Sequence, residues 1–286
     1  MPVNDNILLK LREIKDSLTP VEKMIADYVL ENTAEVPRQS IKALATKSKT
    51  SDASVLRFCK TLGYSGYRDF IVSISASLGS MDEDQADQYT DIQPGDDLQT
   101  IINNISLNNC RSIEDTLRVI NREEISRAVE LLRKSQRIDF YGVAASGLVC
   151  MDAQQKFMRI NKMCHAFTDG HSQLTAATLL KSTDVAVMIS NSGNTTEILE
   201  ALEVAKSSGA KVIAITRYNR SPLAEKADIV LFISTPEITI RSGAMGSRIA
   251  MLNVIDILFA GVASAEYKNV KKYLKKTHDI LLSKQL

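Results

Sequence analysis

The sequence predicts a multidomain protein in which an all-α N-terminal domain precedes an α/β domain with a flavodoxin-like five-stranded parallel sheet. Two observations lead to this prediction. Up to residue 78 apolar residues recur at helical spacing, and from residue 137 short apolar runs rich in β-branched residues alternate with helical patterns. Such alternation is typical of a parallel sheet covered by helices on both faces. We therefore expect domains at residues 1–78 and 98–286, joined by a linker at 79–97.

Three helices of the N-terminal domain have clear start signals. Thr19, with Pro20 beside it and Glu22 three residues later, forms a capping box. We expect the apolar stripe of this helix to consist of Val21, Met24, Ile25, Tyr28 and Val29. Ser40 begins a second short helix, and Ser51 begins a third, which ends at Gly63 and buries Val55, Phe58, Cys59 and Leu62. A short polar turn separates the second and third helices, as in a helix-turn-helix motif.

A local excess of positive charge accompanies this motif, although the formal charge of the whole chain is only +1. Asp52 is the one acidic residue between Arg38 and Arg68, whereas the cations are Arg38, Lys42, Lys47, Lys49, Arg57, Lys60 and Arg68. A solvated helix face has the same appearance, but duplex DNA is the partner that this charge and rhythm fit. The residues that we expect to contact double-stranded DNA are Arg38, Lys49, Ser51, Ser54, Arg57 and Lys60.

The rest of the chain divides into an acidic segment and an α/β pattern. Residues 79–97 contain seven acidic residues and no cation, which indicates a linker. Helical patterns follow at 98–119 and 122–134, and we expect strands within 137–142, 163–167, 184–190, 211–216 and 228–233. Helices are expected within 147–161, 172–181, 195–209, 221–227 and 247–267. The last of these is apolar over much of its circumference, which predicts a helix that is heavily buried or shared with a partner subunit.

The turn after the third strand is made almost wholly of hydroxyls, amides and one glycine. It contains Ser190, Asn191, Ser192, Gly193, Asn194, Thr195 and Thr196. In an open parallel sheet, ligands bind beyond the carboxyl ends of the strands, and the N-terminus of the following helix favours an anion there. These residues also suit a well-capped strand-to-helix turn, but one hydroxyl would satisfy that need. We interpret the turn as a phosphate site without a cation, suited to a small sugar phosphate.

The first strand carries a matching feature. It ends at Gly142 in a run of small residues, and Ser146 lies near the start of the next helix. Small residues here also permit close packing of helix on strand. If the first and third strands are neighbours, as in the flavodoxin-like order, both loops border one crevice.

The segments "YGVAASG" and "ISNSGNTTEILEAL", together with "RSGAMGSRIAMLNVIDILF", resemble the sugar isomerase (SIS) domain, a phosphosugar-binding α/β module, over residues 122–268. The resemblance implies that Ser190, Asn191, Ser192 and Thr195, around Gly193, hold the phosphate. It implies that Ser146 contacts the sugar and that Glu237 aligns with the base of the isomerising members. Related sequences usually have glycine where this chain has Ala144.

An N-terminal helix-turn-helix joined to a SIS domain resembles the RpiR-type transcriptional regulators over essentially the whole chain, and "LRFCKTLGYSGYRDF" is similar to the end of their DNA-binding domain. The resemblance implies a regulator of operator DNA that responds to a sugar-phosphate effector and assembles as a homodimer or homotetramer.

Two other functions remain open at this point. An aldose–ketose phosphate isomerase needs a base, for which Glu237, His165 and His171 are candidates. We expect His165 to lie in the core and His171 to lie on a loop near the site. A sugar-phosphate sensor that acts on another protein would need no basic stripe. We expect no enzyme activity and therefore no catalytic residue.

Composition argues against several other classes. Four scattered cysteines without a CxxC pair, and only three histidines, argue against a zinc site or a disulfide framework, so we expect no metal and no cofactor. We find no apolar run of the roughly 18–20 residues that a membrane span needs, and no secretory signal, so we expect a cytoplasmic protein. The basic C-terminal segment "KNVKKYLKKTHDILLSK" reads as a solvated final helix or a subunit contact.

Overall fold

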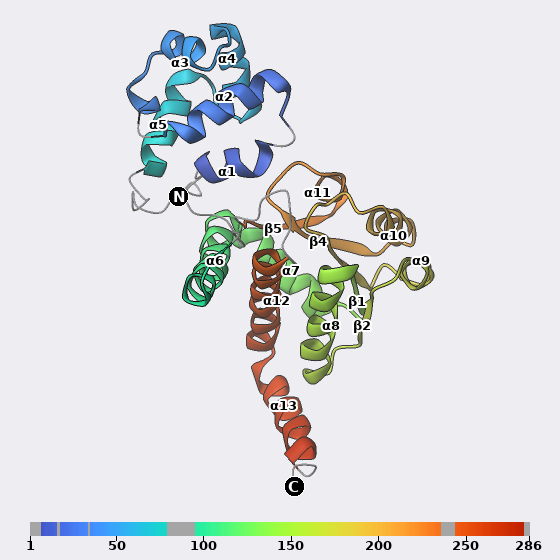
Figure 1. The fold of residues 1–286 in the computed structure, drawn as a ribbon. Coiled ribbons are helices and arrows are strands. Elements are labelled where there is room, and N and C mark those ends of the chain that lie inside the picture. Colours follow the sequence, from blue (N-terminus) through green and yellow to red (C-terminus); the bar gives the residue numbers. More distant parts are fainter. Residues whose placement is uncertain (1–6, 16–17, 34, 79–94, 236–243, 283–286) are drawn as a thin grey trace. The chain divides into compact units, whose positions relative to one another are not determined.

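The computed structural model describes residues 7–15, 18–33, 35–78, 95–235 and 244–282 (Figure 1). The chain divides into two compact units, Met1–Tyr89 with Tyr218–Arg220, and Thr90–Arg217 with Ser221–Leu286. Most of the predicted acidic linker, and Glu237, lie outside the described residues. The domain boundaries at residues 78 and 98 stay a prediction.

The N-terminal unit is a helical domain with its own apolar core. Its elements are α1 (Ile7–Ile14), α2 (Pro20–Glu31), the 3-10 helix η2 (Val36–Arg38), α3 (Ile41–Lys47), α4 (Asp52–Thr61) and α5 (Tyr67–Leu78). The capping box of Thr19 and Glu22 is present, and the hydroxyls of Ser40 and Ser51 accept hydrogen bonds from the first turns of α3 and α4. Phe58 of α4 meets Phe70 of α5 edge to face, with ring centroids 5.8 Å apart. The three start signals are therefore confirmed.

The inward face of α2 differs from the predicted stripe. Ile25 and Val29 are buried as expected, but Ala26 completes the face, while Val21 and Met24 are 44% and 41% exposed. The stripe is shifted because successive residues turn by 100°, so positions 25, 26 and 29 fill the contact with the core and positions 21 and 24 lie at its edge. The prediction for Val21 and Met24 was wrong.

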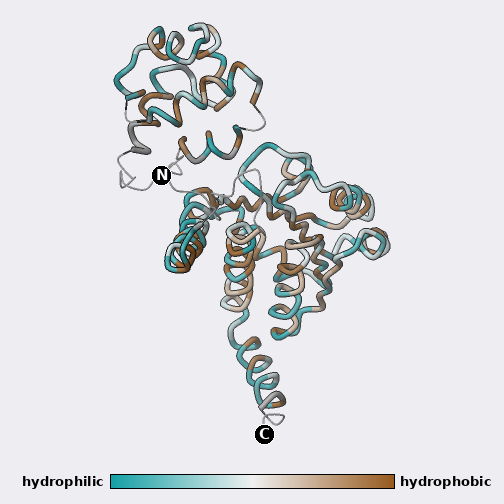
Figure 2. The backbone as a smooth tube through the Cα atoms, viewed as in Figure 1, coloured by the Kyte–Doolittle hydropathy of each residue, from teal (hydrophilic) through white to brown (hydrophobic). Residues whose placement is uncertain are grey.

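The second unit contains a five-stranded parallel sheet in the order β2-β1-β3-β4-β5, which confirms the flavodoxin-like prediction. The strands are β1 (Ile138–Tyr141), β2 (Cys164–Phe167), β3 (Val185–Ile189), β4 (Lys211–Arg217) and β5 (Ile229–Ile233). Each lies within or beside its predicted run, because buried parallel strands read as short, nearly continuous apolar segments. Figure 2 shows these strands as the hydrophobic centre of the unit.

Helices cover both faces of this sheet. One face packs against α7 (Arg122–Lys134), α8 (Ala144–Arg159) and α12 (Met245–Ala265). The other packs against α9 (Gly170–Thr178), α10 (Thr196–Ser207) and α11 (Pro222–Lys226). The long helix α6 (Leu98–Val119) lies on α12, and Thr116 of α6 exchanges hydrogen bonds with the backbone at Ser234, just after β5. The final helix is α13 (Tyr267–Leu282).

By length and composition alone, α12 is apolar enough to cross a membrane, which corrects the expectation that no segment would be. The side of α12 that packs on the sheet belongs to the core of the unit. Ala250, Val254 and Leu258 are fully buried in the core against the sheet, and Asp256 is exposed to solvent. Only a third of the apolar window of α12 is buried, so the prediction that this helix is heavily buried or shared with a partner subunit stays a prediction.

Candidate functional site

The polar turn follows β3 at the carboxyl edge of the sheet, and it is organised by its own hydrogen bonds. Ser190 is buried, and its hydroxyl lies 3.0 Å from the hydroxyl of Thr195 and accepts from the backbone N–H of Gly193 at 3.2 Å. The hydroxyl of Ser192 accepts from the N–H of Asn194 at 3.2 Å, and Ser192 is exposed. Two serine hydroxyls therefore fix the turn, and the exposed Ser192 hydroxyl can donate its own proton to a further acceptor.

The N-terminus of α10 opens from this turn without a side-chain cap. Thr195 is the N-cap residue and has extended backbone dihedral angles, but its hydroxyl accepts no hydrogen bond from the first turn of the helix. The first N–H groups of a helix need acceptors and carry partial positive charge. The hydroxyls of this turn therefore do not serve as the helix cap, which was the alternative explanation for them. A bound anion would supply the hydrogen-bond acceptor that the N-cap side chain does not provide.

Gly193 is required by two features of the structure. Its φ is +65°, which lies in the left-handed region, and a Cβ atom there would lie 2.2 Å from the hydroxyl oxygen of Ser221. Its carbonyl also accepts from the N–H of Leu223 at 3.2 Å. Glycine thus lets the turn pack directly on the segment between β4 and α11.

The loop after β1 lies at the same edge, because β1 and β3 are neighbours in parallel register. A Cβ atom at Gly142 would meet the Cys150 sulfur and the Ser146 carbonyl oxygen at 2.8 Å, so glycine allows the first turn of α8 to approach the strand. Ser146 lies half-buried in that first turn, and its hydroxyl makes a weak 3.9 Å contact with the sulfur of Met251. Ser146, a predicted site residue, and the turn at 190–195 therefore both lie at the carboxyl edge of the sheet.

Ala144, where the resemblance gives glycine, has a φ of +50°. The left-handed region costs an L-residue with a Cβ atom about 1–2 kcal/mol. We expect Ala144→Gly to raise the free energy of unfolding by up to about 1 kcal/mol, after the extra backbone entropy of glycine is subtracted. Ala145→Gly, in the same turn of α8, is the matched control and should lower it by about 0.5–1 kcal/mol. Denaturant unfolding followed by circular dichroism measures both, and equal losses would contradict the strain.

Sequence reasoning missed several polar residues at this edge. Gln173 of α9 is fully buried, and its amide nitrogen donates to the carbonyls of Gly142 at 3.2 Å and Phe167 at 3.0 Å, which ties the ends of β1 and β2 together. The side-chain oxygens of Gln173 and Asn191 are buried without a donor in the part of the chain that the structure describes. The N–H of Arg217 donates to the Asn191 carbonyl at 3.2 Å. The backbone at the last residue of β4 therefore packs on the polar turn.

The two histidines among the predicted catalytic candidates lie on different elements of the sheet domain. Glu237 lies outside the described residues. His171 is exposed in the first turn of α9, not on a loop as expected, because Asp169 caps a helix that begins at Gly170. Backbone and side-chain hydrogen bonds from Ser172 hold the pKa of the Asp169 carboxyl below its ordinary value.

His165 belongs to a separate charged cluster in β1 and β2. Asp139 is fully buried, and its carboxylate accepts two hydrogen bonds from Arg137, at 2.8 and 2.6 Å, and one from the Tyr141 hydroxyl at 3.1 Å. The bond to Asp139 raises the pKa of Arg137, and burial raises the pKa of Tyr141. The His165 Nδ1 atom lies 3.4 Å from Asp139, and its side chain is 47% exposed. Its predicted core position was wrong because β2 is an edge strand.

The N-terminal unit contains the second candidate surface. Helices α3 and α4 are joined by a turn in which Lys49 has a φ of +54°. The exposed side of α4 presents Arg57 and Lys60, and the predicted residues Arg38, Lys49 and Ser51 are exposed as well. Ser54, in contrast to these exposed residues, is buried. Its hydroxyl lies 2.9 Å from the Ser51 hydroxyl and accepts a hydrogen bond from the Arg57 guanidinium at 3.3 Å. In this structure Ser54 positions Arg57 rather than forming part of the open surface.

Comparison with known proteins gives two family models that match separate parts of the chain. A helix-turn-helix domain of the rpiR family matches residues 5–81, and the SIS domain matches residues 131–261. Among the described residues, no group of three His, Cys, Asp or Glu side chains is placed to hold a metal ion.

Relatives and solved structures agree with these models. The chain is 45% identical to an HTH-type transcriptional regulator of Caldanaerobacter subterraneus, over 98% of this chain and 99% of that one. It is 34% identical to the HTH-type transcriptional regulator YbbH of Bacillus subtilis, over 96% and 97%. The structure of the Vibrio vulnificus NanR protein complexed with ManNAc-6P is similar, with a TM-score of 0.62, 28% identity, and coverage of 98% and 99%.

Proposed function

The chain belongs to the RpiR family of helix-turn-helix transcriptional regulators with a SIS domain, and we propose that a phosphorylated sugar bound at the carboxyl edge of its sheet changes its affinity for operator DNA. The observation that carries the proposal is the N-terminus of α10, which opens without a side-chain cap from a turn rich in hydroxyls. A phosphate is the anion that such a helix end and such donors bind.

In this proposal the phosphate lies against Ser190, Asn191, Ser192, Gly193 and Thr195, and the sugar extends toward Ser146. Neutral donors suffice for a sugar phosphate, whose charge is smaller than that of a nucleoside triphosphate with magnesium. NanR, a similar protein over its whole length, has been solved with a sugar phosphate, ManNAc-6P, which supports the chemical class. Glu237 stays a predicted ligand residue.

We assign the site to sensing rather than to isomerisation. The two relatives named above are transcriptional regulators. The Nδ1 atom of His165 lies 3.4 Å from the buried carboxylate of Asp139, and His171 is solvent-exposed in the first turn of α9, which supports sensing over catalysis by either histidine. Effector and DNA then act on each other by linkage, so the operator must change sugar-phosphate affinity by the same factor as the reverse.

The proposal is tested by fluorescence anisotropy on DNA from upstream of the protein's own gene, at fixed salt, with and without a panel of sugar phosphates. We expect specific binding that one sugar phosphate shifts. Binding no tighter than to random DNA under every condition, together with turnover of a sugar phosphate, would favour the isomerase instead.

The same assay tests the basic surface of α4. We expect Arg57→Ala to weaken operator binding by about tenfold, and a phosphate-contacting cation such as Lys60 to lower the salt slope by about one when it is replaced by alanine. Lys23→Ala is the matched control, because Lys23 is a half-buried cation on α2, outside the α3–turn–α4 segment. Unchanged affinity in both α4 variants would contradict the assignment of α4 as the recognition helix.

A further inference from the structure

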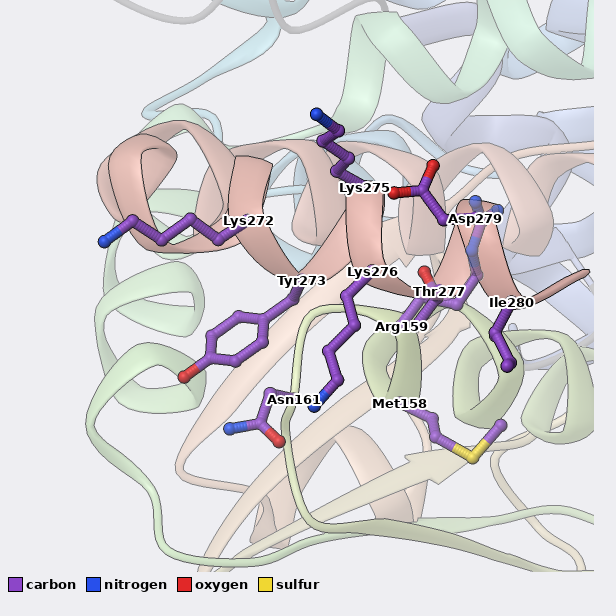
Figure 3. Close-up of a pocket in the computed structure, with 10 residues that line it drawn as sticks. All are labelled: Met158, Arg159, Asn161, Lys272, Tyr273, Lys275, Lys276, Thr277, Asp279 and Ile280. Atoms are coloured by element: carbon purple, nitrogen blue, oxygen red, sulfur yellow. The ribbon is translucent and has the colours of Figure 1, made fainter.

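A groove of about 850 Å³ lies away from the polar turn, between the C-terminal end of α8 and helix α13 (Figure 3). Four cations line it, Arg159, Lys272, Lys275 and Lys276, against one acidic residue, Asp279. Figure 3 shows Lys276 and Tyr273 extending from α13 on the side of Asn161, while Lys275 points to the other side of the helix. The groove is therefore strongly positive and open to solvent.

The positive charge of α13 is offset within the helix by one acidic residue, Asp279. Lys268, Lys272 and Lys276 repeat at intervals of four residues and form one row, and Lys271 and Lys275 form a second. Like charges at this spacing destabilise a helix. In the described part of the chain no acidic side chain lies within 4 Å of any of these five lysines. Among the residues that the structure describes, no carboxylate pairs with these lysines, so a bound anion would stabilise the arrangement.

We propose that this groove binds the phosphate backbone of duplex DNA, as a contact of the SIS domain that is additional to the helix-turn-helix and independent of sequence. The row from Lys268 to Lys276 spans about 12 Å at 1.5 Å per residue. Along that length duplex DNA carries about seven charges. The neutral lining residues Asn161, Tyr273 and Thr277 are also of types that contact phosphate oxygens.

The chemistry of the groove favours a polymer over a small ligand. Its lysines are exposed point charges on flexible stems, and none of the lining side chains is buried. A site for a small anion needs fixed polar groups that orient the ligand. Backbone phosphates need only matching charge, which the rows of α13 provide. The proposal rests on the proposed function in so far as the polyanion is DNA.

The test measures the salt dependence of binding of the full-length chain to random-sequence duplex DNA. We expect the double variant Lys272→Gln with Lys276→Gln to lower the slope of log K against log salt by about two, since each phosphate contact contributes about 0.9. The matched control is Arg122→Gln with Lys181→Gln, which removes the same charge from exposed positions of the same unit outside the groove. The control should leave the slope unchanged.

The same titration on an Arg57→Ala background separates this inference from the proposed function. If the slope stays unchanged in the groove variant while Arg57→Ala weakens binding, the groove proposal is overturned and the helix-turn-helix assignment stands. If the native chain binds no DNA at any salt concentration, the proposed function itself fails. If the groove variant changes the sedimentation mass but not the slope, the occupant is a second copy of the chain, and the DNA proposal is again overturned.

Discussion

Replacement of Asp139 by alanine is expected to lower the free energy of unfolding of the sheet domain by about 3–5 kcal/mol, because it leaves Arg137 beside an empty, buried site. Asp139 is fully buried in β1, where its carboxylate accepts two bonds from Arg137 and one from Tyr141. Removal of the carboxylate takes the acceptor from all three donors at once. A buried group that loses its partner bears the full cost of its own desolvation.

The chain contains no tryptophan, so denaturant unfolding is best followed by far-UV circular dichroism. Glu130→Ala is the matched control, since Glu130 also pairs with an arginine, Arg133, but on the exposed surface of α7. Exposed pairs contribute little, so the control should change stability only slightly. A second variant, Arg137→Leu with Asp139→Leu, removes both charges and should recover much of the loss. Equal losses in Asp139→Ala and Glu130→Ala would show that the cluster does not stabilise the domain.

The Asp139 cluster contains one contact that could have been predicted from the sequence and one that could not. Arg137 directly precedes β1 and Asp139 lies within it, and residues two apart in extended backbone share a face. The pairing was therefore within reach of the sequence but was missed, because the charges at the start of the run "RIDFYG" looked like its polar boundary. His165 was misplaced for a different reason. The strand order β2-β1-β3-β4-β5 decides which strand forms the edge of the sheet. The residues of β2 alone do not indicate that it is an edge strand with an exposed side chain at His165.

Local signals predicted the elements well. The helical patterns predicted α6 and α7 with the bounds that the structure shows. The hydroxyl residues Thr19, Ser40 and Ser51 predicted the N-caps of α2, α3 and α4. The polar turn was found because its residue types are concentrated in a short stretch. Gln173 was not, because its role depends on two carbonyls 31 and 6 residues away that the fold brings together. The groove beside α13 likewise joins segments more than a hundred residues apart.

Ser192→Ala is expected to weaken sugar-phosphate binding by about tenfold to a hundredfold and to leave ligand-free DNA binding unchanged. A hydrogen bond to a charged group contributes about 1.5–3 kcal/mol, which corresponds to that range. Ser192 is exposed, and the Asn194 N–H that its hydroxyl now accepts from is in an exposed residue that water can reach. The substitution therefore removes a donor to the phosphate at little cost to the fold. Isothermal titration calorimetry measures the affinity, and anisotropy without effector measures DNA binding.

The matched control for this prediction is Ser264→Ala, an exposed serine near the end of α12 that lies outside the turn. It should change neither affinity. Linkage adds a second requirement. If Ser192 contributes only to binding, operator DNA must shift the sugar-phosphate affinity of the native chain and of Ser192→Ala by the same factor. A different factor would mean that Ser192 also takes part in the coupling between the sites. Unchanged affinity in Ser192→Ala would remove its hydroxyl from the site and leave the open N-terminus of α10 without the donor assigned to it.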